Sequence, residues 1–293
     1  MLLRNFKMAY VILCHKNPEQ INMLIHSLTD ENVEFFLHVD KKSNIQHEIL
    51  HQNNIHFVEQ RINVHWGHYS QIECILKCFA LIQEHGVFSY IHVISGQDLP
   101  LVSNGIIVDF FKENQGKQYV KHVELPNAAE MWGCLYRVSV YYPKFILSRH
   151  KRVTALRNRY INLIMSVPKL KRNLSSLPNK LYKGSNWMSI TGECMDYILE
   201  FTKNNPGYVD FYRHSFCGDE IFFHSIILNS HFKEQVVNEV KRYTDWTSGP
   251  EFPRTLTVED NERIQSKGTE CFWGRKFDIE VDRTIIREIL QKV

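Results

Sequence analysis

Two adjacent acidic residues, Asp219 and Glu220, open an otherwise apolar and aromatic run that continues through Ile221, Phe222 and Phe223. A carboxylate at such a boundary can be partly desolvated, and desolvation raises a carboxyl pKa toward the range that suits a general base. Acidic residues also favour the first turn of a helix, where they complement the helix dipole. The pair is therefore either a catalytic carboxylate or a helix N-terminus, and both interpretations stay open at this point.

Cations suited to binding phosphate follow the acidic pair in loop-like contexts, namely Arg254, Arg275 and Lys276. The chain has no Asp-x-Asp motif, the type of carboxylate pattern that holds a nucleotide diphosphate through Mg²⁺ or Mn²⁺. An enzyme without such a metal must neutralise a departing diphosphate with fixed arginine and lysine charges. Taken alone, each of these cations is more simply a surface residue.

Several other classes of protein are disfavoured by their missing motifs. The sequence has no GxGxxG or GxxxxGK[ST] phosphate loop, no GxSxG nucleophile elbow and no HExxH zinc motif among its 15 histidines. The net charge of +3 does not indicate nucleic acid. We therefore expect neither a metal ion nor another cofactor, and no nucleic-acid partner.

The first half of the chain alternates buried strands with helices. Apolar runs predict strands at residues 9–14, 33–40, 55–58 and 90–95, and apolar spacing predicts helices at 17–28 and 70–85. This alternation is typical of an α/β fold with a mostly parallel sheet flanked by helices. Functional groups gather beyond the carboxyl ends of such strands, where this sequence places His15, Asp40 and the residues 95–98.

In the second half we predict a strand at 184–190 and helices at 193–201, 219–229 and 283–293. A chain of 293 residues fits one large domain or two small ones. We predict a single domain that comprises a nucleotide-binding half, residues 1–125, and an acceptor and catalytic half, residues 126–293.

Residues 141–191 contain no Asp or Glu but many Lys and Arg, and residues 148–165 could form an amphipathic helix. Such a stretch is either a solvated basic surface or a contact for anionic lipid or an anionic acceptor. The seven cysteines have no paired spacing, which favours free thiols in a reducing compartment. No leader and no spanning segment is evident, so we expect a cytoplasmic protein that contacts the inner face of the membrane at most peripherally.

Taken in order, a series of blocks resembles the core-2/I-branching β-1,6-N-acetylglucosaminyltransferase and peptide O-xylosyltransferase family over nearly the whole chain. The blocks are AYVILCHK at 9–16, LHVDKKS at 37–43, HWG at 65–67, YIHVISGQDLP at 90–100, GSNW at 184–187, DEIFFH at 219–224, YTDW at 243–246 and RKFD at 275–278. Any single block is weak, and the combination in this order is specific.

This resemblance implies an A-type glycosyltransferase fold, a UDP-sugar donor, inversion at the anomeric carbon and no metal ion. Glu220 matches the general base of the family, and Arg254 and Lys276 match the cations that meet the UDP diphosphate, with Arg275 as a neighbour able to share that role. His15 and Asp40 resemble nucleoside-binding positions. The positions that resemble the sugar-facing wall are Asp98, Ser185 and Trp187.

The resemblance implies GlcNAc as the donor sugar, with UDP-xylose as the alternative, and a glycan or lipid-linked glycan as the acceptor, for example a bacterial surface polysaccharide. The membrane anchor and disulfides of the animal members are not visible in this sequence. The rival interpretation is a catalytically silent protein of the same fold that binds nucleotide-sugar or carbohydrate. Glu220, Arg254 and Lys276 together argue against it, because a silent relative is expected to lose the base or a phosphate cation.

Overall fold

The computed structural model describes residues 6–247 and 253–293. Within them a seven-stranded sheet has the order β10-β6-β9-β4-β1-β2-β3. Its strands are β1 (Met8–Cys14), β2 (Val33–Val39), β3 (Ile55–Phe57), β4 (Tyr90–Ser95), β6 (Gln118–Tyr119), β9 (Ser189–Thr191) and β10 (Val236–Val237). β1, β2, β3 and β4 pair in parallel, as do β6 and β10, whereas β9 is antiparallel to β4 and β6. The predicted mostly parallel α/β sheet is therefore confirmed.

Two smaller sheets complete the strand structure. β5 (Asp98–Pro100), β11 (Arg242–Thr244) and β12 (Trp273–Arg275) form one in the order β11-β12-β5. β7 (His122–Leu125) and β8 (Leu181–Gly184) pair antiparallel in the other.

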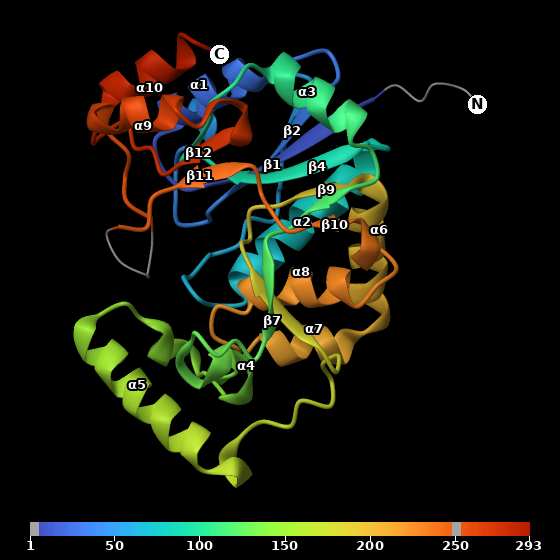
Figure 1. Ribbon diagram of the computed structural model, residues 1–293, viewed down its shortest axis with the longest axis vertical. Helices are drawn as coiled ribbons and strands as arrows, with labels where there is room; N and C mark the ends of the chain where they lie inside the picture. The colour runs from blue at the N-terminus through green and yellow to red at the C-terminus, as the bar shows by residue number, and fades with distance from the viewer. Residues whose placement is uncertain (1–5, 248–252) are drawn as a thin grey trace.

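Helices cover both faces of the large sheet (Figure 1). One face carries α2 (Ser70–His85), α6 (Gly192–Asn204) and α8 (Asp219–Leu228), and the other carries α1 (Pro18–Leu28), α3 (Asn104–Glu113) and α10 (Arg283–Leu290). The remaining helices are α4 (Tyr136–Ser139), α5 (Lys151–Ser166), α7 (Pro206–Tyr212) and α9 (Asn261–Gln265).

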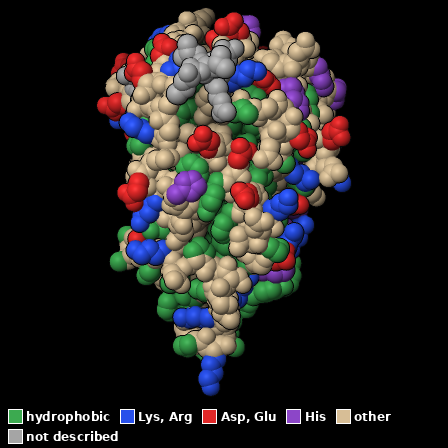
Figure 2. All heavy atoms as spheres, turned by 90° about the vertical axis from the view of Figure 1, so that its right-hand side faces the viewer, with side chains coloured by type: hydrophobic (Ala, Val, Ile, Leu, Met, Phe, Trp, Pro, Cys, Tyr) green, Lys and Arg blue, Asp and Glu red, His purple; other side chains and the backbone are tan. Residues whose placement is uncertain are grey.

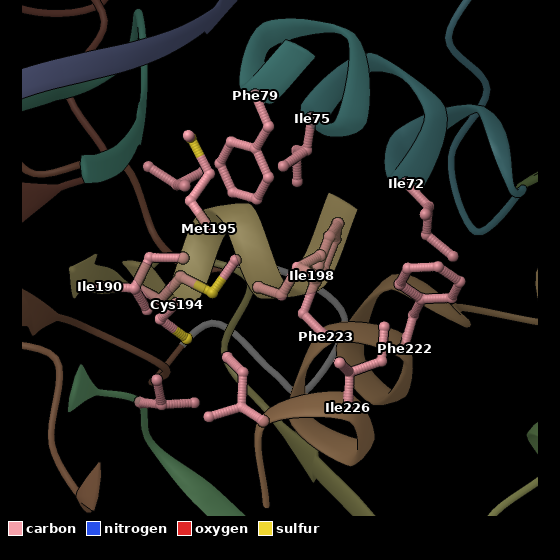
Figure 3. Close-up of a cluster of buried hydrophobic side chains, with 14 of the residues drawn as sticks. Ile72, Ile75, Phe79, Ile190, Cys194, Met195, Ile198, Phe222, Phe223 and Ile226 are labelled. Atoms are coloured by element: carbon pink, nitrogen blue, oxygen red, sulfur yellow. The ribbon is translucent and has the colours of Figure 1, made fainter. Parts of the chain in front are cut away.

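The alternation of side chains along β1 explains the two cores. Ala9 and Val11 point into one cluster, and Met8, Tyr10 and Ile12 point into the other, because successive side chains of a strand face opposite sides of the sheet. Figure 3 shows the first cluster, where α2, α6 and α8 interdigitate; its labelled residues include Phe79, Met195, Ile198, Phe222 and Phe223.

Both clusters draw on residues before and after position 125, so the two halves of the predicted single domain share their hydrophobic cores. β9 comes from the second half and lies between β4 and β6 of the first. The seven-stranded sheet contains strands from both halves, so the boundary at 125/126 falls inside one packed unit.

The seven cysteines all lie in the described residues and all have free thiols, as predicted. Within residues 6–247 and 253–293, no helix has the length and apolar character needed to cross a membrane.

Candidate active site

A cavity of about 180 Å³ lies at the carboxyl ends of β1, β2 and β4. Its wall includes four residues predicted from the sequence, which are His15, Asp40, Trp187 and Arg275. Ligand pockets commonly measure about 300–1,000 Å³, so this cavity is smaller than a typical ligand pocket. The cavity lies at the edge of the sheet where the sequence places the residues that follow the strand ends.

Arg275 reaches the cavity because β12 pairs antiparallel with β5, which places Arg275 opposite Asp98. Its Nη1 donates a hydrogen bond to the Ser95 hydroxyl and lies 3.3 Å from Oδ2 of Asp98. The guanidinium lies 4.2 Å from the centre of the Trp187 ring, a cation–π distance. Burial lowers the pKa of Arg275, and the charge of Asp98 opposes that shift.

Asp98 lies behind the cavity wall rather than on it. The residue is fully buried, with Oδ1 3.2 Å from Nε of Arg242 and Oδ2 accepting from the Ser95 amide at 2.5 Å. A buried carboxylate needs such partners because an unpaired charge is costly inside a protein. Asp98 therefore holds the two arginines, and its predicted contact with the sugar remains a prediction.

Lys276 stands among further positive charges. Burial lowers its pKa, and the charges of Arg275, Lys16 and Arg149 add to that shift while Asp278 opposes it. Its backbone carbonyl accepts from the Leu256 amide at 2.8 Å. A concentration of cations at one edge of a sheet is suited to an anionic ligand.

Arg254 is bound by two carboxylates. Its Nη2 lies 2.9 Å from Oδ2 of Asp245 and also donates to Asp260, and these hydrogen bonds raise its pKa. The side chain is 32% exposed and is not part of the cavity wall. Its predicted contact with a diphosphate remains a prediction, and its observed contacts favour a role in holding Asp245 and Asp260 together.

Glu220 occupies the first turn of α8 with its carboxylate facing two cations. Nη1 of Arg137 donates to Oε2 at 2.6 Å, and Nζ of Lys183 lies 3.9 Å from the same oxygen. The Glu220 side chain is 33% exposed, so a substrate hydroxyl can approach it.

Asp219 points inward, in contrast to Glu220. It is buried and accepts a hydrogen bond from Nδ2 of Asn186. Burial and the neighbouring charge of Glu220 raise the pKa of Asp219. The acidic pair therefore consists of one buried and one accessible carboxylate.

The segment between β8 and β9 contacts both Asp219 and the cavity. The sequence predicted one strand over 184–190, but residues 185–188 leave the ladder. Asn186 holds Asp219, Trp187 lines the cavity, and the Ser185 carbonyl accepts from Nε2 of His224 at 3.0 Å. Ser185 is not among the residues that line the cavity, and its predicted contact with the sugar remains a prediction.

Sequence reasoning missed Arg137, Lys183 and Arg242 as partners of the site carboxylates. Arg137 is 83 positions from Glu220, a separation at which no local spacing reveals a contact. The sequence offers one signal, which is that residues 131–192 contain no acidic residue. A buried cation in this range must therefore pair with a carboxylate from another part of the chain. Across the described ranges, no three His, Cys, Asp or Glu side chains converge in a group that could hold a metal ion.

The Core-2/I-Branching enzyme family model matches residues 8–266. The chain belongs to this family. Membership and the relatives' names support the glycosyltransferase class predicted from the sequence.

Xylosyltransferase 2 of Rattus norvegicus is 22% identical over 308 residues, which cover 97% of this chain and 33% of the rat protein. Xylosyltransferase oxt of Drosophila melanogaster is 20% identical over 296 residues, covering 92% of this chain and 31% of the fly protein. The apo structure of mouse xyloside xylosyltransferase 1 aligns over 91% of this chain and 93% of that chain, with 13% identity and a TM-score of 0.35. The chain thus spans about a third of the length of the xylosyltransferases it matches in sequence.

Proposed function

We propose that the chain transfers a sugar from a UDP-sugar to a glycan hydroxyl, with inversion at the anomeric carbon. The observation that carries the proposal is the convergence of Arg275, Trp187, Asp40 and His15 on one cavity at the carboxyl edge of the sheet. Glu220 follows Asp219, whose carboxylate accepts from Asn186, the neighbour of the cavity residue Trp187. A cationic pocket beside an accessible carboxylate supplies the two functions that such a transfer needs.

In the proposed reaction, the Glu220 carboxylate takes the proton of the acceptor hydroxyl as that oxygen bonds to C1 of the donor sugar. The bond between C1 and the diphosphate oxygen breaks at the same time, and the electron pair leaves with UDP. Arg275 and Lys276 stabilise the negative charge that develops on the diphosphate. Arg137 and Lys183 hold the Glu220 carboxylate in place before the transfer.

We further propose that no metal ion takes part. The missing Asp-x-Asp motif and the cations around the cavity support this mechanism. EDTA should leave donor hydrolysis and transfer intact. A complete loss of activity that Mn²⁺ restores would overturn this part of the proposal.

GlcNAc is our first candidate for the donor sugar, and xylose is the second because the named relatives are xylosyltransferases. A hydrolysis screen over UDP-GlcNAc, UDP-xylose, UDP-galactose and UDP-glucose, with release of UDP as the readout, distinguishes them. The acceptor we propose is a glycan or lipid-linked glycan.

The same screen addresses the rival proposal of a silent binding protein. UDP binding in calorimetry without hydrolysis of any donor, and without transfer to any glycan acceptor, would favour that rival. Hydrolysis that Glu220→Gln removes supports the enzyme.

A further inference from the structure

Helix α5 and its flanking turns present an unpartnered surface at the end of the molecule opposite α10 (Figure 1). We call this the α5 surface. It combines exposed apolar side chains with exposed cations, which are Lys144, Phe145, Arg152, Leu156, Arg159, Leu163, Lys169 and Leu170.

Four of these residues form a single stripe along the helix. Arg152, Leu156, Arg159 and Leu163 are separated by four, three and four positions, a spacing that places side chains on one face. Leu156 is 55% exposed and Leu163 is 59% exposed. A solvated polar face has no need of two leucines, so the stripe indicates contact with something apolar.

The opposite face fixes the helix to the body of the protein. Arg157 is buried and donates to the carbonyls of Ile146 at 3.2 Å and Ser148 at 3.1 Å. Its guanidinium also lies 4.7 Å from the centre of the Phe216 ring. The stripe therefore faces solvent, because the other side of α5 packs against the body of the protein.

The positive charge of the α5 surface favours an anionic partner. No acidic residue occurs between positions 131 and 192. Figure 2 shows Lys, Arg and hydrophobic side chains at the lower end of the molecule, where α5 ends in Figure 1. A two-fold dimer through this face would set arginines against arginines, which disfavours a second copy of the chain.

We propose that the α5 surface docks the protein on an anionic lipid bilayer, independently of whether the proposed transfer reaction takes place. The arginines bind lipid phosphates, and the leucines and Phe145 enter the boundary between headgroups and acyl chains. Neither contribution is strong alone, and together they give reversible binding.

Vesicle flotation tests the proposal with the whole chain. The probes are phosphatidylcholine vesicles with and without about 30 mol% phosphatidylglycerol. We expect binding only to the anionic vesicles, with less binding as NaCl rises from about 50 mM to about 500 mM because salt screens the charges.

Two double variants separate the contributions. Arg152→Glu with Arg159→Glu, and Leu156→Ala with Leu163→Ala, should each weaken binding to anionic vesicles by about tenfold or more. The matched control is Lys112→Glu with Lys203→Glu, which makes the same charge change on exposed positions of α3 and α6 and should bind as the wild type does. Thermal unfolding checks that each variant is folded, and alanine keeps the helix propensity high.

Three results would overturn the proposal. The first is wild-type protein that binds no anionic vesicle, or arginine variants that bind no worse than the control. The second is vesicle binding that the leucine variant retains in full, which would show that the leucines do not enter the bilayer and that charge alone accounts for the binding. The third is a wild-type dimer in sedimentation that the leucine variant dissociates, which assigns the surface to a second copy.

Discussion

The guanidinium of Arg137 lies 2.6 Å from the carboxylate of Glu220, with Nη1 donating to Oε2. This contact connects the short helix α4 to the first turn of α8. Lys183, at 3.9 Å from the same oxygen, approaches from β8. The candidate base is thus oriented by two elements that are distant in sequence.

Replacing Glu220 by glutamine should lower turnover by about 10²- to 10⁴-fold, because the amide cannot accept the proton of the acceptor hydroxyl. UDP affinity should stay near the wild-type value, since the glutamine keeps the size of the side chain and an oxygen for Arg137. Steady-state kinetics and calorimetry on one preparation measure both quantities. Unchanged turnover would show that another group is the base.

Lys276→Ala should weaken UDP binding by about tenfold to a hundredfold, the loss expected for a charge-assisted contact to phosphate. Titration calorimetry with UDP measures the change. An affinity equal to that of the wild type would remove Lys276 from the proposed diphosphate site.

Arg254→Ala should instead lower stability. Its removal deprives the carboxylates of Asp245 and Asp260 of a shared partner. We expect a loss of about 1–3 kcal/mol in the free energy of unfolding, less than for a fully buried pair because a third of the arginine is exposed. If the variant keeps its stability and loses UDP affinity as Lys276→Ala does, Arg254 belongs to the diphosphate site.

Asp98→Asn should lower the free energy of unfolding by about 3 kcal/mol or more, because Arg242 and Arg275 then lose their buried counter-charge. Urea denaturation measures this. The matched control is Asp210→Asn, whose exposed pair with Arg213 should contribute less than about 1 kcal/mol. Equal losses in the two variants would contradict the buried role of Asp98.

His224 should make stability depend on pH. Burial lowers its pKa to about 3, so the unfolded chain binds a proton below the ordinary histidine pKa of 6.5 while the folded chain does not. Stability contributed in this way is fully present above pH 6.5 and falls as the pH is lowered. Near pH 5 the loss amounts to about 2 kcal/mol for one such group.

His224→Gln should therefore reduce the change in unfolding free energy between pH 7 and pH 5, whatever its effect at neutral pH. The matched control is His47→Gln, because the His47 side chain is 77% exposed and the variant should keep the wild-type pH dependence. Identical pH dependence in His224→Gln and the wild type would refute the assignment.

The strands of the first half could be predicted closely because they are continuous apolar runs buried on both faces. The run at 9–14 became Met8–Cys14, and the run at 90–95 became Tyr90–Ser95. Helices α3 and α7 were missed. The break after β8 was also missed, because it depends on tertiary partners: the Asn186 side chain bonds to Asp219, and the Ser185 carbonyl accepts from His224.

The candidate site was predictable where residues follow strand ends, as His15 and Asp40 do. The site was not predictable where a side chain has several possible partners that are distant in the sequence. Arg254 and Arg275 look alike in the sequence, yet one is bound by Asp245 and Asp260 and the other lines the cavity. That choice depends on the register of β12 against β5, which local sequence does not encode.

The pairing of β12 with β5 also determines when the cavity is complete. Its first wall comes from residues 13–16, 38–40 and 95–97, whereas Arg275 arrives about 180 residues after Ser95, its hydrogen-bond partner. A nascent chain that has not yet added residues 273–276 lacks the cation opposite Asp98. We therefore expect affinity for UDP to appear only after β12 has been synthesised and has paired with β5. A fragment comprising residues 1–125 alone should not bind the donor.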